Sequence, residues 1–168
     1  MKSTLALATA LIITVTPFYR NSDTCFENCA ATATGRHLVE NFEGEVDYVY
    51  KDAGGRPTIC FGHLIKQGEH FSLVTPDMCG KLLQKDLEPV ERAINIYTKR
   101  PLKRNEADAL ISLAFNIGTG NLAKSTLLKK VNAKEQTAEE FARWILVNDK
   151  PNNGLLFRRQ AEAALYNL

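Results

Sequence analysis

The fold of this chain is decided by residues 42–63, which read FEGEVDYVYKDAGGRPTICFGH. The segment predicts the end of a helix at Gly44, followed by a strand over residues 46–51, where aromatic and β-branched residues favour extended backbone. Residues 52–55, Asp-Ala-Gly-Gly, indicate a turn, because glycine adopts positive φ at little cost. Strand-forming residues resume at Thr58, so the segment is predicted to fold back on itself as a hairpin.

The predicted hairpin brings three polar side chains around one hollow: Glu43 at the helix end, Asp52 at the turn and Thr58 on the return strand. Glycoside hydrolysis uses such a set, because one carboxyl protonates the leaving oxygen while the other stabilises positive charge or activates water. Taken singly, each residue is more simply explained as a solvated helix end, a turn former or a strand former. Glu45 and Asp47 are also acidic and near, so a count of carboxylates does not select the pair.

Three motifs in this segment resemble the signature of the phage-type lysozymes, the endolysins of glycoside hydrolase family 24. The family's Phe-Glu-Gly, Tyr-x-Asp and Thr-Ile-Gly-x-Gly-His runs match residues 42–44, 50–52 and 58–63, with Cys60 where glycine is common. The similarity continues through four further segments: residues 112–121, 125–128, 154–155 and 158–162. It therefore extends from about residue 36 to the C-terminus, and separated motifs in the same order rarely coincide by chance.

The resemblance implies an α+β, lysozyme-like fold, in which a small β-hairpin lobe and a larger helical lobe flank a glycan cleft. It implies hydrolysis of the β-1,4 bond between N-acetylmuramic acid and N-acetylglucosamine in bacterial peptidoglycan, with inversion at the sugar. The family's catalytic residues fall on Glu43 as general acid, Asp52 as the group that positions water and stabilises charge, and Thr58 as the group that orients that water. No metal, cofactor or nucleic acid is implied, and a monomer is expected.

Two further expectations follow from the resemblance. His63 is expected to be structural, and one of Arg158 and Arg159 is expected to reach toward the acidic site. A nearby guanidinium favours the ionised form of a carboxyl, so burial must oppose it if Glu43 is to stay protonated.

Length and charge bound the remaining possibilities. A chain of 168 residues is long enough for one well-buried core and short for two independent domains. Its net charge of +2 is too small to indicate a nucleic-acid partner, although it fits a mild attraction to anionic cell wall. We expect residues 1–34 to form an export signal or signal-anchor with a linker, and residues 35–168 to form the catalytic domain.

The N-terminal segment is of a different kind. Lys2 precedes an apolar run over residues 5–18, shorter than the ~20 residues of a spanning helix and typical of an export signal. No small-x-small cleavage site follows directly, and four threonines lower the hydrophobicity of the run. Two outcomes stay open: signal cleavage, or the release of a signal-anchor that first tethers the enzyme to the inner membrane, as the resemblance suggests. Both place the enzyme in the periplasm.

The four cysteines agree with export, because an even count in an exported chain suggests disulfides, with three pairings open. A zinc site that includes His63 is the alternative, which the spacing does not favour. The resemblance to membrane-anchored endolysins, which often carry cysteines near the cleft, favours Cys60–Cys79, and we pair Cys25 with Cys29.

The second half of the chain is predicted to be helical. A helix is expected from Pro76, with Thr75 as its N-cap and Pro89 as the point where it kinks or divides. Further helix starts are predicted at Asn105 with Asp108 three residues on, at Ser125, at a Thr137–Glu140 capping box and at Leu155, with Gly118 and Gly120 ending the helix that Asn105 begins.

Two alternatives belong to other functional classes. The first is a catalytically silent, peptidoglycan-binding lysozyme-like module, against which the retention of Glu43, Asp52 and Thr58 argues. The second is a cysteine-based redox or zinc protein, which the scattered cysteines do not favour. Trp144 is expected in the core of the helical lobe rather than as a platform for a sugar ring.

Overall fold

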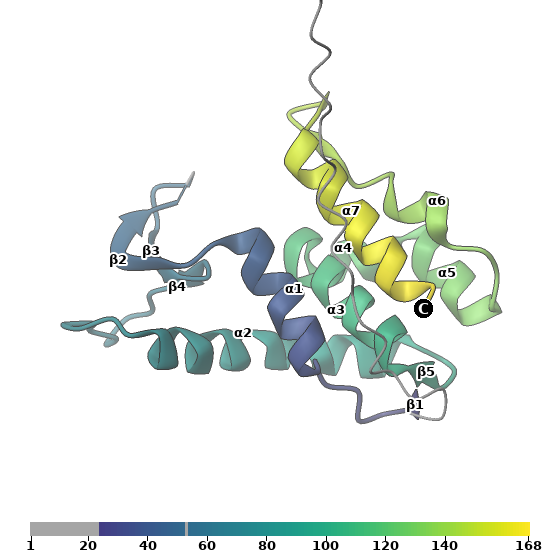
Figure 1. Cartoon of the computed structure of the whole chain (residues 1–168), viewed down its shortest axis with the longest axis horizontal. Helices are drawn as coiled ribbons and strands as arrows, with labels where there is room; N and C mark the ends of the chain where they lie inside the picture. The colour runs from purple at the N-terminus through teal and green to yellow at the C-terminus, as the bar shows by residue number, and fades with distance from the viewer. Residues whose placement is uncertain (1–23, 53) are drawn as a thin grey trace, which may run out of the picture.

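The protein, described by a computed structural model over residues 24–52 and 54–168, has a small sheet lobe beside a larger helical lobe (Figure 1). The expected α+β architecture, with a small sheet lobe and a larger helical lobe, is confirmed. The predicted export segment and the turn residue Ala53 lie outside the described residues. From Thr24 onward, no helix is long and apolar enough to cross a membrane.

The small lobe is a three-stranded antiparallel sheet in the order β2-β3-β4. Its strands are β2 (Val46–Lys51), β3 (Pro57–Cys60) and β4 (His63–Leu64). Tyr50 pairs with Thr58 across β2 and β3, so the predicted hairpin is confirmed. The short strand β4, which the sequence did not reveal, returns through a turn at Gly62, where φ is +83°.

Helix α2 (Pro76–Tyr97) runs from the small lobe along the helical lobe (Figure 1). The Thr75 hydroxyl accepts the Met78 N–H as predicted, and Pro76 occupies the first turn. Pro89 does not divide the helix. Its ring lies on the exposed face, where water can hydrate the carbonyl that loses its N–H partner.

The helical lobe is organised around α3 (Arg104–Ile117), which is buried over most of its surface. Helices α1 (Ala33–Glu43), α2 and α7 (Asn153–Tyr166) pack against it. Gly35 permits the close approach of α1, because a Cβ there would overlap the Asp108 carboxylate. The remaining elements are β5 (Leu102–Lys103), α4 (Thr119–Lys124), α5 (Thr126–Ala133), α6 (Ala138–Phe141), β6 (Leu146–Val147) and β7 (Lys150–Pro151).

The expected start of α3 at Asn105 is wrong. The helix begins at Arg104, and the Glu106 carboxylate accepts the Lys103 N–H at 2.9 Å. Asn105 is buried inside the first turn, and its amide donates to the carbonyls of Leu165 and Tyr166. The residue therefore ties α3 to the end of α7 instead of capping a helix.

The expected capping box at Thr137 is also wrong. Thr137 makes no side-chain cap hydrogen bond to α6, and the Glu140 carboxylate faces Lys130 at 2.8 Å and Arg143 at 3.3 Å. Ser125 does cap α5 as predicted, by accepting the Leu128 N–H. Gly118 ends α3 at a φ of +86°, whereas Gly120 lies within α4.

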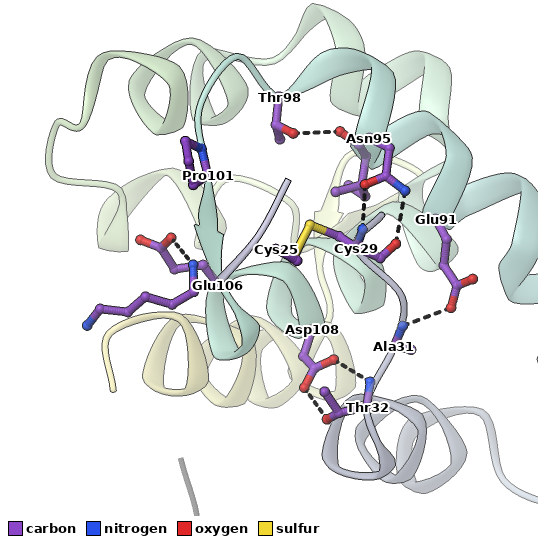
Figure 2. The surroundings of a disulfide bond; sticks show 12 residues. Cys25, Cys29, Ala31, Thr32, Glu91, Asn95, Thr98, Pro101, Glu106 and Asp108 are labelled. Carbon is purple, nitrogen blue, oxygen red and sulfur yellow. Dashed lines mark hydrogen bonds between the residues drawn. A yellow bond between two sulfur atoms is a disulfide. The ribbon is translucent and has the colours of Figure 1, made fainter. Parts of the chain in front are cut away.

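Residues 24–32, here called the N-terminal clasp, are fastened to the helical lobe (Figure 2). Strand β1 (Thr24–Cys25) pairs with β5, and the Cys25–Cys29 disulfide closes a short loop. Three side chains of α2 and α3 bind the clasp backbone: Asn95 accepts the Cys29 N–H at 2.7 Å, Glu91 the Ala31 N–H at 2.8 Å and Asp108 the Thr32 N–H at 2.8 Å. The part of the expected linker that begins at Thr24 is therefore held in place.

The second disulfide, Cys60–Cys79, joins β3 to α2 and thereby links the two lobes. Both predicted pairings are confirmed. Each of the four sulfurs is bonded to another in one of these two disulfides. No cysteine thiolate is left to bind zinc, so the alternative of a zinc site with cysteine ligands is excluded. Cys60 has a φ of +57°, in the left-handed region that favours glycine, which explains why glycine is common at this position of the motif.

Candidate active site

Glu43 is the last residue of α1, at the junction between the two lobes. Gly44 ends the helix with a φ of +72°, and its N–H donates to the Glu40 carbonyl. The Glu43 side chain is 23% exposed, and its Oε1 accepts a hydrogen bond from Arg158 Nη1 at 2.6 Å. A Cβ on Gly62 would lie 4.0 Å from Glu43 Oε2, so the β3–β4 turn passes beside the carboxylate.

Asp52 follows β2 and is held by a dense set of local hydrogen bonds. Its Oδ1 accepts the backbone N–H groups of Gly54 and Arg56, both at 2.9 Å, and its Oδ2 accepts Arg56 Nε at 2.9 Å. The backbone N–H of Arg56, followed by its guanidinium, lowers the pKa of the Asp52 carboxyl. Asp52 is therefore a fixed, ionised carboxylate.

Thr58 lies on β3, where it is 2% exposed and directly opposite Tyr50. Its hydroxyl donates to the Arg56 carbonyl at 3.0 Å. Arg56 therefore organises two of the predicted site residues, because it binds Asp52 with its N–H and guanidinium and Thr58 with its carbonyl. The sequence analysis did not single out Arg56, although the turn composition around Asp52 carries a local signal for such hydrogen bonds.

Tyr50 connects these groups electrostatically. Burial, then the charges of Glu43 and Asp52, raise the pKa of the Tyr50 phenol, so both carboxylates act on the same side chain. No hydrogen bond in the described part of the chain joins Glu43, Asp52 and Thr58 directly. Glu43 and Asp52 therefore flank β2 from its two ends, and Tyr50, which pairs with Thr58, lies within reach of both charges.

The two arginines of α7 have different partners. Arg158 reaches Glu43, and its guanidinium lies 5.5 Å from the centre of the Phe42 ring. Arg159 is turned away and donates to Asn116 Oδ1 and Glu162 Oε1. Arg158 is therefore the residue that meets the expectation of a cation at the acidic site.

His63, which follows Gly62 in the chain, has two partners of its own. Its ring is buried between two carboxylates, with Nδ1 2.7 Å from Asp86 Oδ2 and Nε2 3.0 Å from Glu69 Oε2. A backbone hydrogen bond from Lys66, followed by the bond from His63, lowers the pKa of Glu69. Both ring nitrogens are occupied in joining β4 to α2 and the loop between them, which agrees with a structural role.

Trp144 is half-buried against the core, as expected, and also lines an open hollow of about 570 Å³. Asn116 and Leu155 lie in the same wall. In residues 24–52 and 54–168, no group of three or more His, Cys, Asp or Glu side chains is arranged to hold a metal ion.

Comparisons with known proteins match most of the chain. A family model described as phage lysozyme matches residues 40–162, which include Glu43, Asp52, Thr58 and Arg158. The chain is 39% identical over 141 residues to the endolysin of Salmonella phage P22, covering 80% of this chain and 96% of that protein. It is 38% identical over 132 residues to the SAR-endolysin of Enterobacteria phage P21, covering 77% and 79%. Among solved structures, the muramidase domain of SpmX from Asticaccaulis excentricus is similar with a TM-score of 0.76 at 29% identity, covering 83% of this chain and 98% of that chain.

Proposed function

Because this chain belongs to the phage lysozyme family, we propose that Glu43, Asp52 and Thr58 are the residues with which it cleaves its substrate. The chain is a lysozyme, a glycoside hydrolase that acts on peptidoglycan. The observation that carries the assignment of residues is the 2.6 Å ion pair that holds Glu43 between the lobes, beside the sheet that presents Asp52 and Thr58.

Glu43 is the general acid in this proposal. It gives its proton to the glycosidic oxygen as the β-1,4 bond after N-acetylmuramic acid breaks. Arg158 holds the Glu43 carboxyl in place through its hydrogen bond at 2.6 Å. A bound glycan covers the exposed part of the Glu43 side chain and so brings the glycosidic oxygen to the carboxyl.

Asp52 and Thr58 act on the opposite side of the reaction. The lowered pKa of Asp52 keeps its charge available to stabilise the oxocarbenium-like sugar and to position a water molecule. The Thr58 hydroxyl donates its hydrogen bond to the Arg56 carbonyl. Its oxygen can therefore accept a hydrogen bond from that water. Attack by this water gives inversion at the sugar, the outcome that the family resemblance implies.

The test is a matched pair of carboxamide variants at neighbouring positions. Glu43→Gln removes the proton donor but keeps the shape, and we expect lysis of purified cell walls to fall by about 10²- to 10⁴-fold. Glu45→Gln, on an exposed residue two positions away, is expected to retain activity within about twofold. Substantial lysis by a folded Glu43→Gln variant would assign the proton to another acid. Binding of glycan by this variant would show that cleavage alone was lost.

We propose further that residues 1–19 are an export device that brings the enzyme to the periplasm, where it acts as a monomer. Support comes from the short, threonine-interrupted apolar run and from the similarity to a protein named SAR-endolysin. A signal-anchor leaves the original N-terminus on the active enzyme, and release follows collapse of the membrane potential. Replacing Thr9 and Thr14 by leucine should then hold the protein in the membrane and delay lysis.

The N-terminal sequence of the active enzyme decides between the two routes. This N-terminal sequence is determined in the soluble fraction before and after addition of an uncoupler. The mass of the soluble enzyme, measured by light scattering, tests whether it is a monomer. An N-terminus at Met1 or Lys2 that appears only after the uncoupler supports the signal-anchor. A start beyond Tyr19 in both samples means ordinary signal cleavage.

A further inference from the structure

Glu162 is a fully buried carboxylate one helical turn beyond the arginine that binds Glu43. Its exposed fraction is 0%, and its Oε1 accepts three hydrogen bonds. The donors are Ser112 Oγ at 2.7 Å, Arg158 Nε at 3.2 Å and Arg159 Nη2 at 3.0 Å. Its Oε2 lies 3.0 Å from Arg159 Nε. Three donors on one oxygen suit an ionised carboxylate, which is acceptor-only.

The three nitrogens of the Arg158 guanidinium bind three different partners. Nε binds Glu162, Nη2 donates to the Ser112 carbonyl at 3.2 Å and Nη1 binds Glu43. The bonds to Glu162 and to the Ser112 carbonyl on α3 therefore orient the guanidinium, so that Nη1 points at Glu43. Without Glu162, the Nε end of the guanidinium loses its charged partner.

Arg159 brings a second positive charge to the same place. Burial lowers its pKa to about 10, which still leaves it charged at neutral pH, and the charges of Glu162 and Glu43 both oppose that lowering. Arg159 thus acts electrostatically on Glu43 without touching it. Burial raises the pKa of Glu162, and the two guanidinium groups oppose this shift.

The titratable groups that act on Glu43 come from α7 and β2. Helix α7 supplies Arg158, Arg159 and Glu162, and β2 supplies the neutral phenol of Tyr50, which also senses Asp52 at the turn. The β3–β4 turn brings the uncharged Gly62 beside Glu43 Oε2. Two cations therefore act on Glu43, Arg158 through a hydrogen bond and Arg159 at longer range, and Glu162 is the anion bonded to both of them.

We propose that Glu162 is a positioning residue of the active site, which aims Arg158 at Glu43 and compensates the charge of Arg159, so that the general acid faces one uncompensated guanidinium instead of two. The proposal rests on the proposed function, in which Glu43 must be protonated when the glycosidic bond breaks. Each additional cation nearby favours the ionised carboxyl. Glu162 thereby extends the pH range over which Glu43 holds its proton.

The experiment measures kcat/KM against pH for Glu162→Gln, Arg159→Gln and the double variant in the full chain. Glu162→Gln leaves the charges of Arg158 and Arg159 uncompensated near Glu43. The alkaline limb of the profile should then shift to lower pH by about one pH unit. Arg159→Gln removes one cation, and the limb should move up by a similar amount. The double variant restores the charge balance and should return close to the parent profile. Glu139→Gln makes the same charge change on the exposed surface of α6 and should leave the limb in place.

A second readout separates this inference from the proposed function. The ¹³C signal of the Glu43 carboxyl reports its proton directly, whether or not Glu43 is the general acid, and its midpoint should shift in the same directions. If folded Glu162→Gln and Arg159→Gln leave that midpoint unchanged, or move it oppositely, the inference is overturned. If the midpoint moves while Glu43→Gln remains active, the proposed function fails and the charge network stands. Should Glu162→Gln not fold, the upward shift in Arg159→Gln decides alone.

Discussion

Gly44 fixes the direction in which the chain leaves Glu43, and its backbone is one that side chains rarely tolerate. Its φ of +72° and ψ of 143° lie in a region that is almost exclusive to glycine. An added Cβ would meet nothing within 4 Å, so Gly44→Ala tests the backbone alone. We expect it to lower the free energy of unfolding by about 1–3 kcal/mol, and to reduce activity because Glu43 is adjacent.

Gly80→Ala is the matched control for this prediction. Gly80 lies inside α2, again with nothing within 4 Å of an added Cβ. Alanine is the better helix former, so this change should raise the free energy of unfolding by about 0.5–1 kcal/mol. Urea denaturation of both variants checks the two signs. Equal destabilisation by both changes would contradict the backbone explanation for Gly44.

The residues of the site were predictable to different degrees. Glu43, Asp52 and Thr58 were selected by ordered motifs, and the hydrogen bonds of Asp52 are local to its turn. The choice of Arg158 over Arg159 depends on how α7 packs against α3. The partnership between Glu162 and Ser112 joins residues 50 positions apart, so no pattern in the neighbouring sequence reports it.

At the level of elements, local capping signals succeeded where no distant group competed for the side chain. Thr75 and Ser125 bind the N–H groups of their own helices, as predicted. Asn105 failed as a cap because the carbonyls at the end of α7 take its amide. The Thr137–Glu140 box failed because Lys130 of α5 takes the carboxylate. Tertiary partners thus override local propensity at these two helix starts.

Pro89 shows that tertiary packing can also override a local signal that predicts a break in a helix. The sequence marks it as a point where α2 kinks or divides, yet the helix continues from Pro76 to Tyr97. A proline on the exposed face leaves its orphan carbonyl in contact with water, and the buried residues before and after it, Leu87 and Val90, keep the helix on the core. Burial of one helix face outweighs one lost hydrogen bond.

At the scale of the whole molecule, the two disulfides act on different parts of the fold. Cys60–Cys79 links the lobes across a sequence separation of 19, whereas Cys25–Cys29 closes a separation of 4 within the clasp. In the chain-entropy model, the first contributes roughly 3 kcal/mol and the second roughly 2 kcal/mol. Replacing each pair by alanines and measuring urea denaturation should therefore show the larger loss for Cys60–Cys79.

A third variant tests the backbone at Cys60 separately from its bond. Because φ is +57° there, alanine adds a left-handed penalty that glycine avoids. Cys60→Gly with Cys79→Ala should be about 1 kcal/mol more stable than the double-alanine variant. If the two variants have equal stability, the left-handed backbone at residue 60 relaxes once the bond is gone.

The two-lobe architecture could be predicted from the family resemblance, but the N-terminal clasp could not. Residues 20–35 carry no apolar period, and the clasp, residues 24–32, is held by Asn95, Glu91 and Asp108, side chains that lie far along the chain. A segment held through its backbone by distant polar groups has the composition of a linker.

The clasp also determines how a pulling force on the N-terminal end would enter the molecule. Tension at Thr24 passes through the β1–β5 pair and through the bonds to Asn95 and Glu91 into the helical lobe. The Cys25–Cys29 disulfide prevents the residues between these two cysteines from being extended by the force. The sheet lobe lies at the opposite end of α1 from the clasp (Figure 1), off this line of force. The molecule can therefore be held by its N-terminal end while the geometry around Glu43 carries little of the strain.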